Sequence, residues 1–146
     1  GGDTRSIRSW PDNALIINFW ATWCAPCRRE IPLLKDFQSA HAEESVQVIG
    51  IAIDRLEPVK EFARDIEFNY PVLVGQPDAM DAASAFGVEF FALPFTVFTD
   101  TEGNILGVHT GEVHSEDLEN LSQILTDLTA RATDLATARD RLAKSL

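Results

Sequence analysis

The chain contains two cysteines, Cys24 and Cys27, and two residues separate them. They lie between an apolar run and a stretch whose hydrophobic residues repeat at helical spacing, which places the pair at the start of a helix. There the unpaired backbone N–H groups and the positive end of the helix dipole stabilise a thiolate, the form of cysteine that attacks disulfides. We therefore predict a redox-active dithiol.

The positions of the two cysteines predict different roles. Cys24 precedes the first helical turn, so we expect an exposed nucleophile that forms a mixed disulfide with a partner. Cys27 lies one turn further on, so we expect it to be shielded and to resolve that mixed disulfide. Ala25 and Pro26 form the loop between them, which the fixed φ of Pro26 stiffens.

Two positive side chains, Arg28 and Arg29, follow the dithiol directly. Their charge favours a nearby thiolate. The alternative, which we prefer, is that both are ordinary solvated residues of the helix.

A C-x-x-C pair is also half of many zinc sites. Further ligands would have to come from His41, His109 and His114, which contain no His-x3-His pair. A purely structural disulfide is the other alternative, but the loop that it would close is short and stabilises little. We expect no metal and no cofactor.

Composition limits the class of protein and of partner. A formal net charge of −11 disfavours nucleic acid, whose phosphates are neutralised by Lys and Arg. A protein or a small thiol is the more suitable partner. We expect one domain over residues 11–146, after a tail at residues 1–10 that begins with Gly1-Gly2, typical of a cloning remnant. A native signal or membrane anchor upstream is compatible with this.

The elements that hold the dithiol alternate between strands and helices, as in an α/β fold. The first half of the chain predicts a buried central strand over 14–20, a helix from Ala25 to about Glu43 that Pro32 kinks, and a second buried strand over 46–53 that ends at Asp54. The apolar face of the first helix includes Ile31, Leu34, Phe37 and Gln38.

The second half continues the alternation. It predicts a helix of about ten residues opening at Pro58, a short strand over 70–74, a helix from Pro77 and Asp78 to Phe86 and Gly87, an antiparallel hairpin over 95–99 and 105–109, and a last helix that Ser115 caps. The last helix has apolar residues as far as Leu142, which predicts a long C-terminal helix. Either it breaks near Ala130 to Thr133, or residues 130–146 project from the domain.

The segment N-F-W-A-T-W-C-A-P-C-R-R-E-I-P, from Asn18 to Pro32, resembles the thioredoxin superfamily and, within it, the bacterial TlpA, ResA and CcmG proteins. The resemblance extends from about Trp10 to Leu128. It implies a thioredoxin-like fold, with a central mixed β-sheet flanked by helices. About forty positions separate Asp54 from Pro94. That is enough for an extra helix-strand insertion, which favours the TlpA and ResA branch over plain thioredoxin.

The resemblance implies further site residues. Pro94 matches the family's cis-proline, which faces the dithiol, and a cis bond exposes the backbone of Leu93 to a bound peptide. Trp23 matches the active-site tryptophan. Asp54 lies where the family has an acidic residue, often Glu, that assists proton transfer at the second cysteine, although it is equally suited to end a strand or cap a helix.

Other polar and aromatic residues of the segment have simpler interpretations. Trp20 is expected in the core and Glu30 in solvent. His109 and His114 are both expected at the surface.

The function that the resemblance implies is the reduction of disulfides in extracytoplasmic partner proteins, with electrons from a membrane dithiol donor. A periplasmic location and a part in cytochrome c maturation are typical of this branch. A copper(I)-binding module is an alternative from another class, since thiolates select soft metals. An oxidase that donates disulfides is a variant of the first function.

Overall fold

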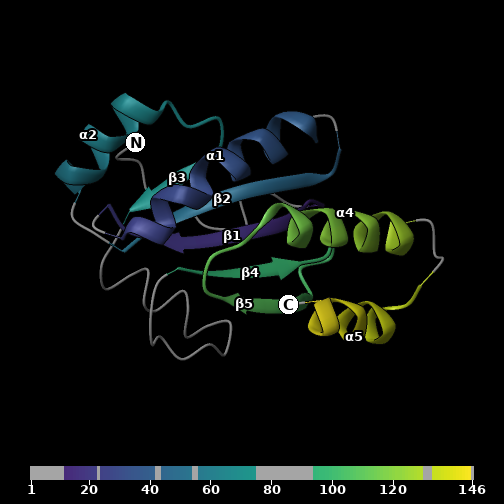
Figure 1. Ribbon diagram of the computed structural model, residues 1–146. Coiled ribbons are helices and arrows are strands. Elements are labelled where there is room, and N and C mark those ends of the chain that lie inside the picture. Colours follow the sequence, from purple (N-terminus) through teal and green to yellow (C-terminus); the bar gives the residue numbers. More distant parts are fainter. Residues whose placement is uncertain are drawn as a thin grey trace.

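The computed structural model describes residues 12–22, 24–41, 44–53, 56–74, 94–129 and 133–145. Its centre is the predicted mixed sheet, which has five strands in the order β3-β2-β1-β4-β5 (Figure 1). The strands are β1 Ala14–Trp20, β2 Val46–Ala52, β3 Val72–Val74, β4 Phe95–Thr99 and β5 Ile105–Thr110.

Strand β1 is central because six of its seven side chains, on both faces of the sheet, are apolar. All seven of its residues are buried. It pairs in parallel with β2 and antiparallel with β4, so that Asn18 lies between Gly50 on one side and Thr96 on the other. The predicted hairpin of β4 and β5 is confirmed. Its turn contains Gly103 at φ +87°, a conformation that favours glycine.

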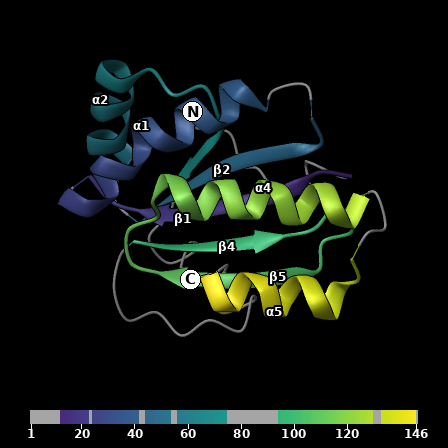
Figure 2. The same ribbon diagram turned by 45° about the vertical axis from the view of Figure 1, so that its right-hand side comes forward.

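The described helices are α1 Ala25–Ala40, α2 Leu56–Ile66, α4 Ser115–Thr129 and α5 Leu135–Ser145. All four contribute to the core on the face of the sheet that carries Ile16 and Trp20. Figure 2 shows α4 crossing this face and α5 lying along β5. Leu15, Ile17 and Phe19 form a second cluster on the opposite face.

Helix α1 has the predicted apolar face, because Ile31, Leu34, Phe37 and Gln38 are all buried. Pro32 lies inside it, and a kink there stays a prediction. Helix α2 begins at Leu56 rather than at Pro58. With β3 it accounts for a helix and a strand between Asp54 and Pro94. The helix predicted from Pro77 to Gly87 and the tail at 1–10 lie outside the described residues.

Of the two alternatives for the C-terminal helix, a break near Ala130 to Thr133 agrees with the structure, which has the two helices α4 and α5 in place of one. The other alternative, an end that projects from the domain, disagrees with the packing of α5 in the core. Helix α4 ends at Thr129, and α5 begins after Asp134, whose carboxylate accepts a hydrogen bond from the N–H of Thr137 at 2.7 Å. Ala138 and Leu142 are both fully buried. The chain folds back because the apolar side chains of α5 pack against α4 and β5. In the part of the chain that the structure describes, no helix is long and apolar enough to cross a membrane.

Candidate active site

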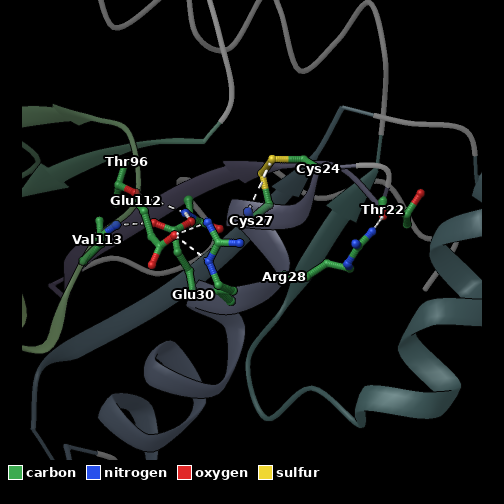
Figure 3. Close-up of a disulfide and its surroundings, with 10 residues drawn as sticks. Thr22, Cys24, Cys27, Arg28, Glu30, Thr96, Glu112 and Val113 are labelled. Carbon is green, nitrogen blue, oxygen red and sulfur yellow. Dashed lines mark hydrogen bonds and ion pairs between the residues drawn. A yellow bond between two sulfur atoms is a disulfide. The ribbon is translucent and has the colours of Figure 1, made fainter.

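The two cysteines form a disulfide at the N-terminus of α1, with their Cα atoms 5.3 Å apart (Figure 3). Cys24 is the N-cap residue, and its backbone is extended. Its Sγ accepts a hydrogen bond from the N–H of Cys27 at 3.3 Å. A sulfur in this position receives a donor that the helix would otherwise leave unpaired, and it lies at the positive end of the helix dipole.

The expected exposure of Cys24 is wrong in this oxidised state. Cys24 is 6% exposed and Cys27 is fully buried. In this state the Cys24 sulfur is bonded to the fully buried Cys27 and lies over the first helical turn, where it accepts the Cys27 N–H. The order of exposure is as predicted. In the loop between them Ala25 is exposed and Pro26 half-buried.

The two arginines after the dithiol are exposed and engaged elsewhere. Arg28 donates from Nη1 to the carbonyl oxygen of Thr22 at 2.7 Å. Arg29 forms an ion pair with Glu112 at 2.9 Å. Both contacts fix the start of α1 to its surroundings.

Pro94 lies at the same end of the sheet as the dithiol. The next residue, Phe95, pairs with Phe19 at the end of β1, close in sequence to the cysteines. Pro94 is buried, and its carbonyl oxygen accepts the N–H of Gly111 at 2.9 Å. Three other predicted site residues, Trp23, Asp54 and Leu93, lie outside the described residues.

The prediction that Glu30 lies in solvent is wrong, because its side chain is fully buried. It lies three residues after Cys27, so both side chains are on one face of α1 (Figure 3). Oε1 of Glu30 accepts from Nδ2 of Asn18 at 3.0 Å, and Oε2 accepts from the N–H of Val113 at 2.6 Å. Two donors from distant parts of the chain therefore hold this carboxyl inside the core.

The environment raises the pKa of Glu30 from 4.5 to about 7. Burial is the main cause, because it penalises the charged form. The hydrogen bonds from Val113 and Asn18 oppose burial, and the charge of Glu112 adds a smaller increase. A carboxyl with such a pKa gains and loses a proton near neutral pH.

Three buried polar residues of this site were missed from the sequence. They are Glu30, Asn18 and Thr96, all fully buried. Asn18 is a polar residue within an otherwise apolar strand, and that break in the pattern was a usable signal. Trp20 is fully buried, as predicted.

The prediction that both histidines lie at the surface is confirmed for His114 and only in part for His109. The side chain of His114 is 68% exposed. His109 is only half-buried, and its Nε2 lies 2.9 Å from the carbonyl oxygen of Glu112. Among the described residues, no group of three or more His, Cys, Asp or Glu side chains is arranged to hold a metal ion.

Known proteins that are similar to this chain include thiol-disulfide oxidoreductases. The profile of the AhpC/TSA family matches residues 1–108. The thiol-disulfide oxidoreductase ResA of Halalkalibacterium halodurans is 25% identical over 125 residues, which cover 85% of this chain and 69% of the relative.

Two solved structures extend this similarity. A thiol:disulfide interchange protein of the thioredoxin family from Chlorobium tepidum is 30% identical, with a TM-score of 0.70 and 81% of each chain covered. A secreted thiol-disulfide isomerase from Corynebacterium glutamicum is 28% identical, with a TM-score of 0.76 over 86% of this chain and 78% of that one.

Proposed function

Because the chain belongs to the AhpC/TSA family and is a thiol-disulfide oxidoreductase of the thioredoxin fold, we propose that it reduces disulfides in partner proteins outside the cytoplasm. The observation that carries this proposal is the position of the Cys24 sulfur. It caps α1 and accepts the N–H of Cys27, which is the environment that stabilises a thiolate once the disulfide is opened.

The reaction begins from the reduced dithiol. The Cys24 thiolate attacks one sulfur of the partner disulfide, forms a mixed disulfide and releases the other partner sulfur as a thiolate, which takes up a proton. Cys27 then loses its proton and attacks the Cys24 sulfur. This step forms the Cys24–Cys27 disulfide and releases the second partner thiolate, also to be protonated. Two electrons pass from the dithiol to the partner.

The resolving step needs an acceptor for the Cys27 proton. Glu30 is suited to it, because it is buried on the same helical face and its pKa is raised to about 7, close to the pH at which the protein would work. Asp54 is the candidate from the family resemblance. We place Glu30 first because burial, hydrogen bonds and position on α1 all support it.

Partner binding is proposed at the loop and at the proline beside it. Ala25 and Pro26 offer an accessible surface next to Cys24, and Trp23 is expected to cover the dithiol. Leu93 before Pro94 is proposed to pair its backbone with an extended peptide. The hydrogen bond from Gly111 to the Pro94 carbonyl supports this, because it holds the proline fixed from the sheet side.

Location and electron donor belong to the same proposal. We place the protein in an extracytoplasmic space such as the periplasm, with a membrane dithiol protein as donor and cytochrome c maturation as one pathway of use. The match to ResA and to a protein described as secreted supports the location. A membrane anchor upstream of residue 1 is compatible with it.

Insulin reduction tests the activity. Wild type, Cys24→Ser and Cys27→Ser are compared at equal concentration with dithiothreitol as the donor. We expect turnover to fall to the background rate in Cys24→Ser, and Cys27→Ser to accumulate a mixed disulfide. Undiminished turnover in Cys24→Ser would contradict the proposal. The reduction potential decides direction, because about −270 mV fits a reductant and about −120 mV an oxidant.

A second experiment separates the two proton acceptors. Resolution of a preformed mixed disulfide is followed from pH 5 to 9 in Glu30→Gln and Asp54→Asn. We expect Glu30→Gln to slow resolution and to flatten its pH profile. If only Asp54→Asn does so, the assignment to Glu30 is wrong.

A further inference from the structure

Asn18 is a polar side chain in β1, a strand of which every residue is buried. It lies between Ile17 and Phe19 in β1 and is fully buried. An amide in such a position costs free energy unless its hydrogen bonds are made. An apolar residue would serve the strand as well, so the contacts of this amide indicate what it contributes.

Nδ2 of Asn18 makes two hydrogen bonds. It donates to Oε1 of Glu30 at 3.0 Å and to Oγ1 of Thr96 at 3.1 Å. An amide nitrogen has two hydrogens and no acceptor, so both of its hydrogens are used. The oxygen of Glu30 that faces Asn18 must accept, which favours the carboxylate over the protonated acid at that oxygen.

Thr96 fixes the direction of this donor. It is the cross-strand partner of Asn18 in the antiparallel pair of β1 and β4, so the sheet register places its hydroxyl beside the amide. Thr96 is fully buried. It also lies two residues after Pro94, so the amide joins the carboxyl on α1 to the strand that follows the proline.

We propose that Asn18 is a positioning residue for the redox reaction: anchored by Thr96, it holds the Glu30 carboxyl in place on the dithiol side of α1 and keeps it able to release its proton. The proposal rests on the proposed function, in which Glu30 receives the proton of Cys27. Asn18 acts through Glu30 and makes no contact with the partner protein.

The other groups around Glu30 define what Asn18 must offset. From the segment after β5, Val113 donates its N–H, and Glu112 adds a negative charge that opposes ionisation. Arg29 on α1 is ion-paired with Glu112. Tyr70 is a buried hydroxyl whose pKa is raised by burial and by the charge of Glu30. Among these, Val113 and Asn18 are the two hydrogen-bond donors to the carboxyl.

The test uses the reduced protein labelled with carbon-13 at glutamate carboxyls, with Glu30→Gln to assign the Glu30 signal. Titration by NMR gives the pH at which Glu30 ionises, independently of any activity. Asn18→Leu removes both hydrogen bonds at similar size, and we expect the midpoint to rise by about one to two pH units. Asn18→Asp replaces the donor with an acceptor, and we expect a larger rise.

A pair of threonine variants guards against loss of folding in the Asn18 variants. Thr96→Val removes the hydroxyl that accepts from Asn18, and we expect it to raise the Glu30 midpoint by less than Asn18→Leu does. Thr96→Ser keeps the hydroxyl, so we expect the wild-type midpoint. Thr99→Val is the matched control on the same strand. Thr99 is 2% exposed and accepts the N–H of Leu15, so its loss leaves Glu30 untouched.

The second readout is the pH profile for resolution of the mixed disulfide, which is expected to move together with the midpoint. An unchanged midpoint in Asn18→Leu and Thr96→Val would overturn the proposal. A shifted ionisation midpoint of Glu30 with an unchanged pH profile for resolution of the mixed disulfide would also overturn it. If Glu30→Gln then resolves as wild type does, the proton transfer assigned to Glu30 fails as well. If Glu30→Gln is impaired, only the role of Asn18 fails.

Discussion

The carboxylate of Glu30 accepts a hydrogen bond from the backbone N–H of Val113 at 2.6 Å, although 83 residues separate the two in sequence. The contact ties the first helix to the segment between β5 and α4 (Figure 3). The same segment begins with Gly111, whose N–H binds the Pro94 carbonyl. One short stretch of backbone therefore holds both the buried acid and the proline of the site.

The raised pKa of Glu30 makes folding stability depend on pH. In the unfolded chain this carboxyl ionises near 4.5, and in the folded protein near 7. Between these values the unfolded state releases a proton that the folded state keeps, so the free energy of unfolding falls as pH rises. The loss attributable to Glu30 is about 3 kcal/mol by pH 8.

Urea unfolding of the oxidised protein at pH 4, 5, 6, 7 and 8 measures this loss. In Glu30→Gln the side chain at position 30 does not titrate. We therefore expect the free energy of unfolding of this variant to rise relative to that of wild type from pH 4 to pH 8. The difference between the two proteins removes the contribution of all other groups. A constant difference from pH 4 to 8 would show that Glu30 ionises alike in both states.

The unequal burial of the cysteines predicts an order of chemical modification. In the reduced protein at pH 7, Cys24 is expected to react with iodoacetamide roughly tenfold faster than Cys27 or more, since thiolate character and access both favour it. Peptide mapping by mass spectrometry after short exposures gives the two rates. Cys27→Ser serves as the control for Cys24 alone. Equal labelling of both sulfurs would contradict the division into nucleophile and resolving thiol.

Much of the sheet was predictable because its signals are local. The apolar run at 14–20 and the turn at Asp100 to Gly103 each determine an element without help from distant residues. The dithiol was predictable for the same reason, since strand, cysteines and helix are consecutive. The low exposure of Cys24 was not predictable, because it depends on how the folded chain packs around the dithiol.

The buried polar network needed information that a single sequence lacks. Glu30 stands four residues before Leu34, on the apolar face of α1, but a charged side chain there is ordinarily exposed, and that expectation outweighed its position. The partnership of Asn18 with Thr96 depends on strand register across 78 residues. Nothing in the local pattern of either strand specifies that register.

The apolar periodicity continues across the break between α4 and α5, so the sequence left a break near residues 130–133 and a projecting helix open as alternatives. Leu128 and Leu135 are a heptad apart, so the pattern reads as one helix. Both helices bury their apolar faces in the same core, which maintains the stripe although the chain changes direction. Residues 130–134, which connect the two helices, contain neither proline nor glycine, the residues that commonly mark a helix end.

The position of α5 predicts that its apolar residues support the domain. Leu142 is fully buried, so Leu142→Ala is expected to lower the free energy of unfolding by about 2 to 5 kcal/mol. Lys144→Ala is the control on the same helix, because its side chain is 76% exposed and forms an ion pair with the exposed Asp140, and we expect no measurable change. Urea unfolding compares them. Equal free energies of unfolding for Leu142→Ala and wild type would contradict the packing of α5 and favour an end that projects from the domain.

Gly50 predicts a steric limit beside the buried network. It pairs with Asn18, and a Cβ added there would lie 3.1 Å from Nε1 of Trp20 and 3.3 Å from Cε2 of Tyr70. Both rings are buried and packed, so neither yields freely. Gly50→Ala is therefore expected to lower the free energy of unfolding by about 1 to 3 kcal/mol and to shift the NMR signal of the Trp20 indole N–H.

Gly103→Ala is the matched glycine control for this prediction. A Cβ at Gly103 meets nothing within 4 Å, but the backbone there has φ +87°. We expect a cost of about 1 kcal/mol from backbone strain alone, with the Trp20 signal unmoved. If Gly50→Ala behaves in the same way as Gly103→Ala, the close packing of Trp20 and Tyr70 over the strand pair of β1 and β2 is wrong.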